Sequence, residues 1–264
     1  MTDQDHIEII EVAHEMANAA RLAIMPHFRA ASLIAENKLE HDFDPVTAAD
    51  RAAEVAMRDV LAKRRPQDGI FGEEFGVSEG ESGLTWVLDP IDGTRAFISG
   101  TPTWGVLIAL SDVNGPMFGV VDQPYIGERF VGGFGVAEVT GPMGRHKLAT
   151  RSTKTLAEAT IFTTFPEVGQ KADREGFEAV AQRCKLTRYG MDCYAYALVA
   201  AGQADLVVEA GLSAYDIQGP MAVIQAAGGV VTNWQGGAAH DGGRVLAAAN
   251  PEIHAAALEI LSRA

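Results

Sequence analysis

The sequence of 264 residues predicts an α/β protein whose first half is α+β and whose second half is α/β. Helical patterns come first, and strand-like segments joined by short connections then fill residues 69 to about 140, which favours antiparallel pairing. Beyond about residue 150, strand-like and helical segments alternate, as is typical of α/β layering. We therefore expect two lobes, 1–147 and 148–264, with a boundary at "GRHKLAT".

The first half begins with two helices. Apolar residues at helical spacing predict a helix from residue 4 to about 35, with Pro26 as a point where it kinks. The second runs from Thr47, as N-cap, to Pro66, with Asp50 three residues after the cap. The strand-like segments that follow are rich in β-branched and aromatic residues: 69–74, 84–89, 104–110, 116–123 and 128–139. A short helix is expected to begin at Gly93-Thr94.

The second half alternates. Strands are expected at 160–165, 185–190, 204–211, 229–234 and 244–250, and helices at 174–184, 191–202 and 216–229. The last helix should begin at Asn250-Pro251, because asparagine is a good N-cap and proline suits the first helical position.

Composition and charge exclude several classes of function. The net charge of −14 disfavours nucleic-acid binding, and no apolar run approaches the roughly 18 residues needed to cross a bilayer. The acidic start "MTDQDHIEII" lacks a signal-peptide layout, so a cytoplasmic protein without a membrane partner is expected. Cys184 and Cys193 form no C-x-x-C pair, and the scattered histidines make a zinc site an unfavoured interpretation.

Carboxylates gather at the ends of the predicted elements, where functional residues are often found. They are Asp50, Glu73-Glu74, Asp89, Asp92 and Asp216. Each has a structural alternative: Asp50 as part of a capping box with Thr47, Asp216 as an N-cap, Glu73-Glu74 as a solvated strand end, and "DPIDGT" as a polar turn. Taken together, these hard oxygen ligands suit Mg²⁺ or Mn²⁺. The helix start at Gly93-Thr94-Arg95 would attract an anion, so the pattern indicates a phosphate-ester site.

The segment "WVLDPIDGTRAF" resembles the D-P-[I/L]-D-G-T signature of the inositol monophosphatase-like superfamily of metal-dependent phosphatases. "DPVTAAD", "GEE" and "AYDIQGPMAVIQAAGG" match further motifs of that family, in the family order and over most of the chain. The resemblance implies a layered αβαβα sandwich and a homodimer.

The same resemblance implies the ligands of two or three Mg²⁺ ions, with Mn²⁺ as a substitute: Glu73, Asp89, the Ile91 carbonyl, Asp92 and Asp216. Asp89 would bridge two ions. Thr94, paired with Asp50 and assisted by Glu73, would position or deprotonate the attacking water. Gly93, Thr94 and neighbouring N–H groups would hold the phosphate.

The substrate is indicated by departures from the family signature. The usual G-T-x-N-[F/Y] is replaced by Gly93-Thr94-Arg95-Ala96-Phe97, and "TTFPEVG" and "RYGMDCYAYAL" are similar to the branch that hydrolyses histidinol phosphate. Asp192 and Glu209 fall at family positions that face the substrate alcohol, and two carboxylates suit an ammonium and an imidazole better than a neutral polyol. Their alternatives are a helix N-cap for Asp192 and a strand-end charge for Glu209.

A histidinol-phosphatase is therefore the expected function, with Asp192, Glu209, Asp216 and Arg95 among the substrate-binding residues. Arg95 would reach the phosphate or a carboxylate across a subunit boundary. An inositol or broad sugar monophosphatase is the enzymatic alternative. A non-catalytic binding protein on the same scaffold is the other, and the complete carboxylate set argues against it.

Overall fold

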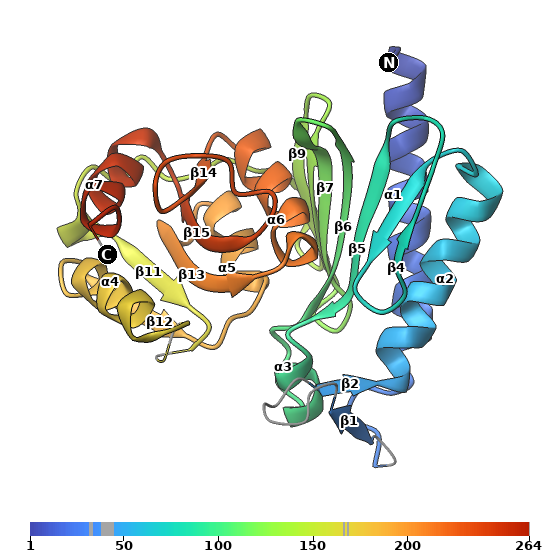
Figure 1. The fold of residues 1–264 in the computed structure, drawn as a ribbon, viewed down its shortest axis with the longest axis horizontal. Helices are drawn as coiled ribbons and strands as arrows, with labels where there is room; N and C mark the ends of the chain where they lie inside the picture. Colours follow the sequence, from blue (N-terminus) through green and yellow to red (C-terminus); the bar gives the residue numbers. More distant parts are fainter. Residues whose placement is uncertain (32–33, 38–44, 166, 168, 264) are drawn as a thin grey trace.

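The computed structural model describes residues 1–31, 34–37, 45–165, 167 and 169–263, which form five alternating layers of helices and sheets (Figure 1). Helices α1 (Asp3–Ile24) and α2 (Ala48–Arg64) cover one face of a large sheet. Helices α5 (Tyr194–Ala200) and α6 (Ala214–Ala226) separate it from a smaller sheet, whose outer face carries α4 (Lys171–Ala181) and α7 (Pro251–Leu261). This αβαβα arrangement is the layered sandwich expected from the sequence.

The large sheet has the strand order β10-β9-β8-β7-β6-β5-β3-β4. All its neighbours pair antiparallel, as expected, except β3 and β5, which are parallel because β4 intervenes between them in the chain. Its strands are β3 (Gly69–Gly72), β4 (Gly76–Ser78), β5 (Thr85–Asp92), β6 (Gly105–Asp112), β7 (Gly115–Gln123), β8 (Glu128–Gly133), β9 (Val136–Gly141) and β10 (Gly144–Lys147). The short helix α3 (Thr94–Ser99) follows β5, and a small ladder joins β1 (Ala35–Asn37) to β2 (Pro45–Thr47).

The smaller sheet has the order β12-β11-β13-β15-β14 and is mixed. Strand β11 pairs parallel with both β12 and β13, whereas β15 pairs antiparallel with β13 and β14. The strands are β11 (Thr160–Thr163), β12 (Leu186–Tyr189), β13 (Leu206–Leu212), β14 (Val230–Asn233) and β15 (Gly243–Ala248), and a 3₁₀ turn, η1 (Leu156–Glu158), precedes β11.

Three hydrophobic cores lie between the five layers, because successive residues of a strand face opposite sides of the sheet. Val106 and Ile108 of β6 pack toward α1 and α2, whereas Leu107 between them packs toward α5 and α6. The third core joins the smaller sheet to α4 and α7 through residues such as Phe177 and Ile253. The middle layer is therefore apolar on both sides, which suits the apolar sequence of α6.

Two predicted boundaries were wrong. The first helix ends at Ile24 rather than near residue 35, since Pro26 has no N–H to donate and its ring obstructs the preceding turn. The predicted stretch also included Ser32 and Leu33, which lie outside the described residues. The single strand expected over 128–139 is a hairpin of β8 and β9, because Gly133, Phe134 and Gly135 all have positive φ and reverse the chain.

Among the described residues, no helix is both long enough and apolar enough to cross a membrane.

Candidate active site

A cavity of about 310 Å³ opens where the ends of β3 and β5, helix α3, strand β13 and the start of α6 meet. Six acidic side chains and one basic side chain are among the residues that line it: Glu73, Asp89, Asp92, Asp192, Glu209, Asp216 and Arg95. All seven were singled out from the sequence, and the fold brings them together from segments more than a hundred residues apart. Such an excess of acid in one cavity favours either a bound cation or the protonation of some of the carboxyl groups.

Asp89 and Asp92 reach the same cavity because β5 contains a β-bulge between them. Asp89 is paired with Leu107 of β6 and Asp92 with Gly105, so three steps along β5 match only two along β6. Without the extra residue, two side chains three apart in a strand would point to opposite faces. Pro90 lies inside this irregularity, where a missing N–H costs no ladder hydrogen bond. The bulge in "DPID" therefore directs the carboxylates of Asp89 and Asp92 into the same cavity.

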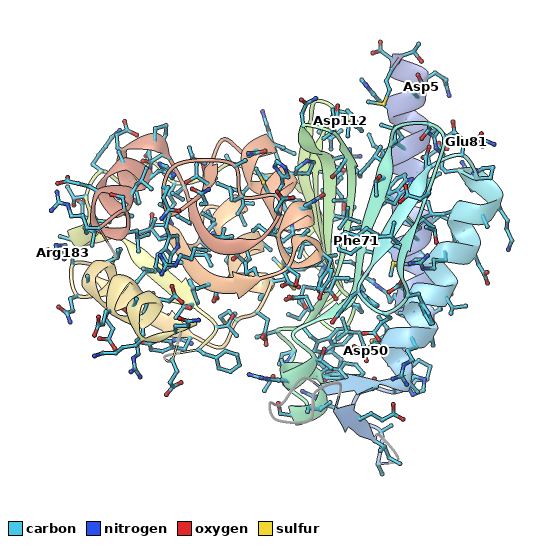
Figure 2. All side chains as sticks on the ribbon, in the orientation of Figure 1. Asp5, Asp50, Phe71, Glu81, Asp112 and Arg183 are labelled. Atoms are coloured by element: carbon cyan, nitrogen blue, oxygen red, sulfur yellow. The ribbon has the colours of Figure 1, made fainter. Side chains whose placement is uncertain are left out.

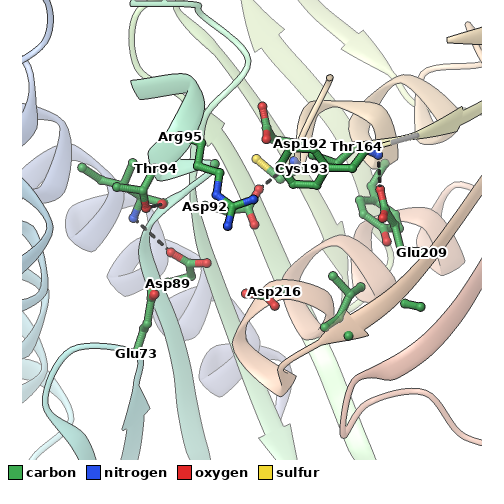
Figure 3. Close-up of a pocket in the computed structure, with 17 residues that line it drawn as sticks. Glu73, Asp89, Asp92, Thr94, Arg95, Thr164, Asp192, Cys193, Glu209 and Asp216 are labelled. Carbon is green, nitrogen blue, oxygen red and sulfur yellow. Dashed lines mark hydrogen bonds between the residues drawn. The ribbon is translucent and has the colours of Figure 1, made fainter. Parts of the chain in front are cut away.

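Asp216 completes a cluster with this pair (Figure 3). One oxygen from each of Asp89, Asp92 and Asp216 can be chosen so that all three lie within 4.8 Å of one another. Asp216 is not the N-cap of α6, which is the alternative given for it above. The N-cap is Ser213, and Asp216 is the third residue of the helix. The carboxylate of Asp216 accepts a hydrogen bond from the Ser213 backbone N–H, at a distance of 2.7 Å. The capping interaction thus orients a carboxylate that also faces the cluster.

The electrostatics of the cluster fit a bound divalent cation. Burial raises the pKa of Asp89 well above its usual range, and the neighbouring charges of Glu73, Asp92 and Asp216 raise it further. Burial also raises the pKa of Asp92, which Asp216 and Asp192 reinforce. Carboxylates in this state are stabilised as anions by a cation between them, and their hard oxygens match the preference of Mg²⁺ and Mn²⁺. The donor set therefore fits such an ion.

Glu73 is held next to the cluster by a buried carboxylate that the sequence motifs did not reveal. Glu54, on α2, has no exposed surface and accepts hydrogen bonds from the backbone N–H groups of Glu74, at 2.7 Å, and Phe75, at 3.3 Å. Arg58 pairs with the same carboxylate at 2.8 Å. A Cβ on Gly72 would come within 1.9 Å of the Glu54 Oε1 atom, so only glycine lets the chain wrap around it. The turn that carries Glu73 is thus built around Glu54.

Asp50 forms the capping box with Thr47 and also lies near the Thr94 hydroxyl. Its Oδ2 atom accepts hydrogen bonds from the Thr47 N–H, at 2.8 Å, and the Thr47 hydroxyl, at 2.6 Å, as in a capping box. Its Oδ1 atom lies 3.5 Å from the Thr94 hydroxyl, which also donates to the Ile91 carbonyl at 3.1 Å. Figure 2 shows Asp50 at the end of α2 that lies near α3. Of the motif "DPVTAAD", Asp44 lies outside the described residues.

Gly93 and Asp192 mark the contact between the two halves of the cavity. Gly93 has φ of 84°, and a Cβ there would come within 2.8 Å of Asp192. Asp192 itself has φ of 47°, an uncommon conformation for a non-glycine residue. It is not an N-cap, since Cys193 occupies that position, and its Oδ2 atom instead accepts a hydrogen bond from the Thr103 hydroxyl at 2.6 Å. Burial raises its pKa.

Glu209 lies within β13, and it is buried rather than being a solvated charge at the end of a strand. It is 7% exposed and accepts hydrogen bonds from the Thr163 hydroxyl, at 3.1 Å, and the Thr164 N–H, at 2.6 Å. Burial raises its pKa to about 7, against the opposing effect of these hydrogen bonds. A second bulge follows it, between Glu209 and Leu212. Neither Glu209 nor Asp192 forms an ion pair with a basic side chain in the described part of the chain.

Arg95 extends from α3 over the cluster (Figure 3). Its guanidinium carbon lies 4.9 Å from the centre of the Phe165 ring, which belongs to the segment after β11. The two side chains therefore meet across the cavity. Phe165 comes from the motif "TTFPEVG", in which Pro166 and Val168 lie outside the described residues.

Tyr196, on α5, also lines the cavity, although the sequence did not mark it as a functional residue. It is 4% exposed, and its hydroxyl has no hydrogen-bond partner among the described residues. Burial raises the pKa of the phenol well above its usual range, and the charges of Glu209, Asp92 and Asp216 add to the effect. In the sequence, the position of Tyr196 in a helical pattern of apolar residues could not be told from that of an ordinary core residue. Tyr196 is indeed part of the hydrophobic core.

Comparison with known proteins places this arrangement among phosphatases. The model of the inositol monophosphatase family matches residues 5–264. The chain is 36% identical to the bifunctional phosphatase IMPL2 of Arabidopsis thaliana, over 99% of this chain and 77% of that protein. It is 34% identical to a histidinol-phosphatase of Streptomyces coelicolor, over 95% of each. The structure of an inositol monophosphatase from Zymomonas mobilis aligns with a TM-score of 0.85 at 38% identity, covering 99% of this chain and all of that one.

Proposed function

The chain belongs to the inositol monophosphatase family of phosphatases, and from this premise we propose that it hydrolyses L-histidinol phosphate to L-histidinol and phosphate, using Mg²⁺. The relatives named histidinol-phosphatase support this substrate. The observation that carries the proposal is the pair of carboxylates Asp192, which is half-buried, and Glu209, which is buried; both line the cavity beyond the acidic cluster and have no basic partner in the described structure.

The two carboxylates match the chemistry of this substrate alcohol. L-histidinol has an ammonium and a titratable imidazole, which can both pair with carboxylates through charge-assisted hydrogen bonds. A neutral polyol would leave both carboxyl groups without a cation to stabilise their charged form, at a cost in binding free energy. Thr103 holds Asp192, and Thr163 with Thr164 holds Glu209, so both acids are oriented before the substrate binds.

The acidic cluster would hold the metal. Glu73, Asp89, the Ile91 carbonyl, Asp92 and Asp216 are the residues that would hold it. When bound, Mg²⁺ lowers the pKa of a coordinated water and offsets the charge that develops on the phosphoryl oxygens.

The remaining residues would position the reacting groups. The Thr94 hydroxyl, which lies between the Asp50 carboxylate and the Ile91 carbonyl, would orient the attacking water. As the Thr94 oxygen takes a proton from that water, its own hydrogen would pass to the Asp50 carboxylate. Glu73 would assist in holding that water. The backbone N–H groups of Gly93 and Thr94 and the Arg95 guanidinium would bind the phosphate oxygens.

The test is a panel of phosphate esters assayed for phosphate release with Mg²⁺, with Mn²⁺ and with a chelator. We expect kcat/KM to be highest for L-histidinol phosphate and activity to be lost in the chelator. Asp192→Asn should reduce turnover of L-histidinol phosphate by about tenfold or more and turnover of glycerol 2-phosphate much less. Asp241→Asn, which alters a side chain that is 95% exposed, is the matched control.

An inositol monophosphatase is the second candidate, because the structure from Zymomonas mobilis is described as one and shares 38% of its residues with this chain. Activity on inositol 1-phosphate equal to or above that on L-histidinol phosphate would support it over the first. An equal loss on both esters in Asp192→Asn would remove Asp192 from the explanation of specificity.

A further inference from the structure

Helix α3 is held at its C-terminal end by an arginine from a distant part of the chain. The Nε and Nη2 atoms of Arg29 both donate hydrogen bonds to the carbonyl of Gly100, the C-cap of α3, at 2.9 and 2.7 Å. The last carbonyl groups of a helix have no partner within it, and a basic side chain is a favourable donor to them. Arg29 comes shortly after the end of α1, so it ties the region after the first helix to the helix that follows β5.

The side chains around Arg29 fix its guanidinium in place. Its Nη1 atom donates to the Tyr125 hydroxyl at 2.7 Å, and its guanidinium carbon lies 4.6 Å from the centre of that ring and 5.0 Å from that of Phe28. Phe28 in turn packs against Phe97 of α3, with 5.3 Å between the ring centres. Arg29 also has φ of 60°, an uncommon conformation for a non-glycine residue, and such strained conformations cluster at functional sites. Although Arg29 is exposed, its contacts are therefore those of a specific clamp on α3.

The position of α3 decides a contact at its other end. Thr94, the first residue of this six-residue helix, has its hydroxyl 3.5 Å from the Oδ1 atom of Asp50. That distance is at the outer limit of a hydrogen bond, so a shift of a few tenths of an ångström decides whether the bond forms. A helix of this length spans only about 9 Å and moves as one body, and Asp50 belongs to α2 rather than to α3. Holding the C-terminal end of α3 therefore also holds Thr94 against Asp50.

We propose that Arg29 is a positioning residue for the reaction: by clamping the C-terminal end of α3, it keeps the Thr94 hydroxyl within reach of Asp50 and of the attacking water. The inference rests on the role of Thr94 in the proposed function, and not on the identity of the substrate alcohol. Arg29 is not among the described residues that line the active-site cavity, so its effect on turnover passes through α3.

A double-mutant cycle with Thr94 tests the inference. Arg29→Ala removes the clamp and leaves Phe28 packed on Phe97, so we expect a folded protein whose kcat is about tenfold lower for L-histidinol phosphate and glycerol 2-phosphate alike. Thr94→Val removes the hydroxyl at nearly constant shape and should lower kcat by about 100-fold. Adding Arg29→Ala to Thr94→Val should then change kcat by less than about twofold, because the group that Arg29 positions is absent. A merely structural residue would lower kcat by the same factor in both backgrounds.

Three further measurements complete the design. Arg29→Lys keeps a charged donor for the Gly100 carbonyl but loses the planar guanidinium, so kcat should return to within about threefold of the wild type. The affinity of Arg29→Ala for Mg²⁺, measured by calorimetry, should stay within about twofold of the wild type, since the acidic cluster is unaltered. Arg145→Ala is the matched control, because it removes an exposed arginine that pairs with Glu138 at 2.8 Å and should leave the kinetics unchanged.

The outcomes separate this inference from the proposed function. Unchanged kcat in Arg29→Ala, or an equal loss in the Thr94→Val background, would overturn the role of Arg29 and leave the proposed function standing. Full activity in Thr94→Val would remove the role of Thr94 and the inference with it. Faster turnover of inositol 1-phosphate than of L-histidinol phosphate would overturn the proposed substrate alone, since the cycle can be measured on either ester.

Discussion

At the scale of single residues, the site depends on local irregularities that redirect side chains. The spacing of Asp89 and Asp92 would place them on opposite faces of a regular strand, and the bulge at Pro90 places them on one. Asp192 reaches the cavity through a left-handed backbone conformation, against a glycine that leaves room for it. Strained or irregular backbone of this kind is characteristic of functional sites.

Asp89→Asn should separate the contribution of the cluster to activity from its destabilising effect on the metal-free fold. The variant removes a buried charge that lies among other carboxylates. In the absence of metal, its free energy of unfolding should therefore be higher than that of the wild type by about 1 kcal/mol. Its Mg²⁺-dependent phosphate release should fall by about 100-fold or more, because a proposed ligand has lost its charge. Urea unfolding in a chelator and phosphate release with Mg²⁺ measure the two effects.

Asp122→Asn offers the opposite case and serves as the control. Asp122 is buried, like Asp89, but it is paired with Arg21 at 2.8 Å and Arg129 at 2.6 Å. Removing its charge should lower the free energy of unfolding by about 3 kcal/mol. If Asp89→Asn also destabilised the metal-free protein, the cluster would have a structural role and the explanation by like-charge repulsion would be wrong.

At the scale of elements, helix α2 supports the site as well as the core. Its first turn presents Asp50, and one turn later Glu54 holds the backbone after β3. The helix start was predictable from Thr47 and Asp50, and the last helix from Asn250-Pro251, because capping residues act locally. The role of Glu54 was not predictable, since it depends on a turn twenty residues further along the chain.

Glu54→Ala should therefore affect both stability and the site. It leaves two backbone N–H groups without their acceptor and Arg58 without its partner, so the free energy of unfolding should fall by about 3 kcal/mol. Mg²⁺ should bind more weakly, because the turn that carries Glu73 has lost its support; calorimetric titration with Mg²⁺ measures this. Glu259→Ala, which breaks an exposed pair with Arg263, should change stability by less than about 0.5 kcal/mol and leave Mg²⁺ binding unaltered. Normal Mg²⁺ affinity in Glu54→Ala would contradict this role.

At the scale of the whole molecule, the fold class followed from patterns in the single sequence, namely antiparallel strands with short connections and then alternating strands and helices. The five layers followed from the resemblance to the phosphatase family, and the observed sheets and hydrophobic clusters confirm them. The carboxylates were also identified in advance, because their motifs are short and ordered. What the sequence could not provide were groups defined only by tertiary contact, such as Glu54 and Tyr196, whose local patterns are those of ordinary helical residues.

Because the cluster joins two side chains of β5, and Glu73 after β3, to the start of α6, its charge state should affect the stability of the entire fold. Folding raises the pKa of Asp89, Asp92 and Asp192, and that of Glu209 to about 7. In the metal-free protein the folded state then binds more protons than the unfolded state at pH values above the ordinary carboxyl pKa. The contribution of these four carboxyl groups to the free energy of unfolding should therefore fall as the pH rises from about 5 to about 8, against the opposite contribution of His14 and His254, whose pKa burial lowers. Bound Mg²⁺ should remove most of this decline, because it stabilises the anionic carboxylates and binds only the folded chain. Urea unfolding at a series of pH values, in Mg²⁺ and in a chelator, should therefore give two curves that diverge toward high pH. A chelator curve that stays level or rises over this interval would show that the carboxylates are compensated by groups within the protein.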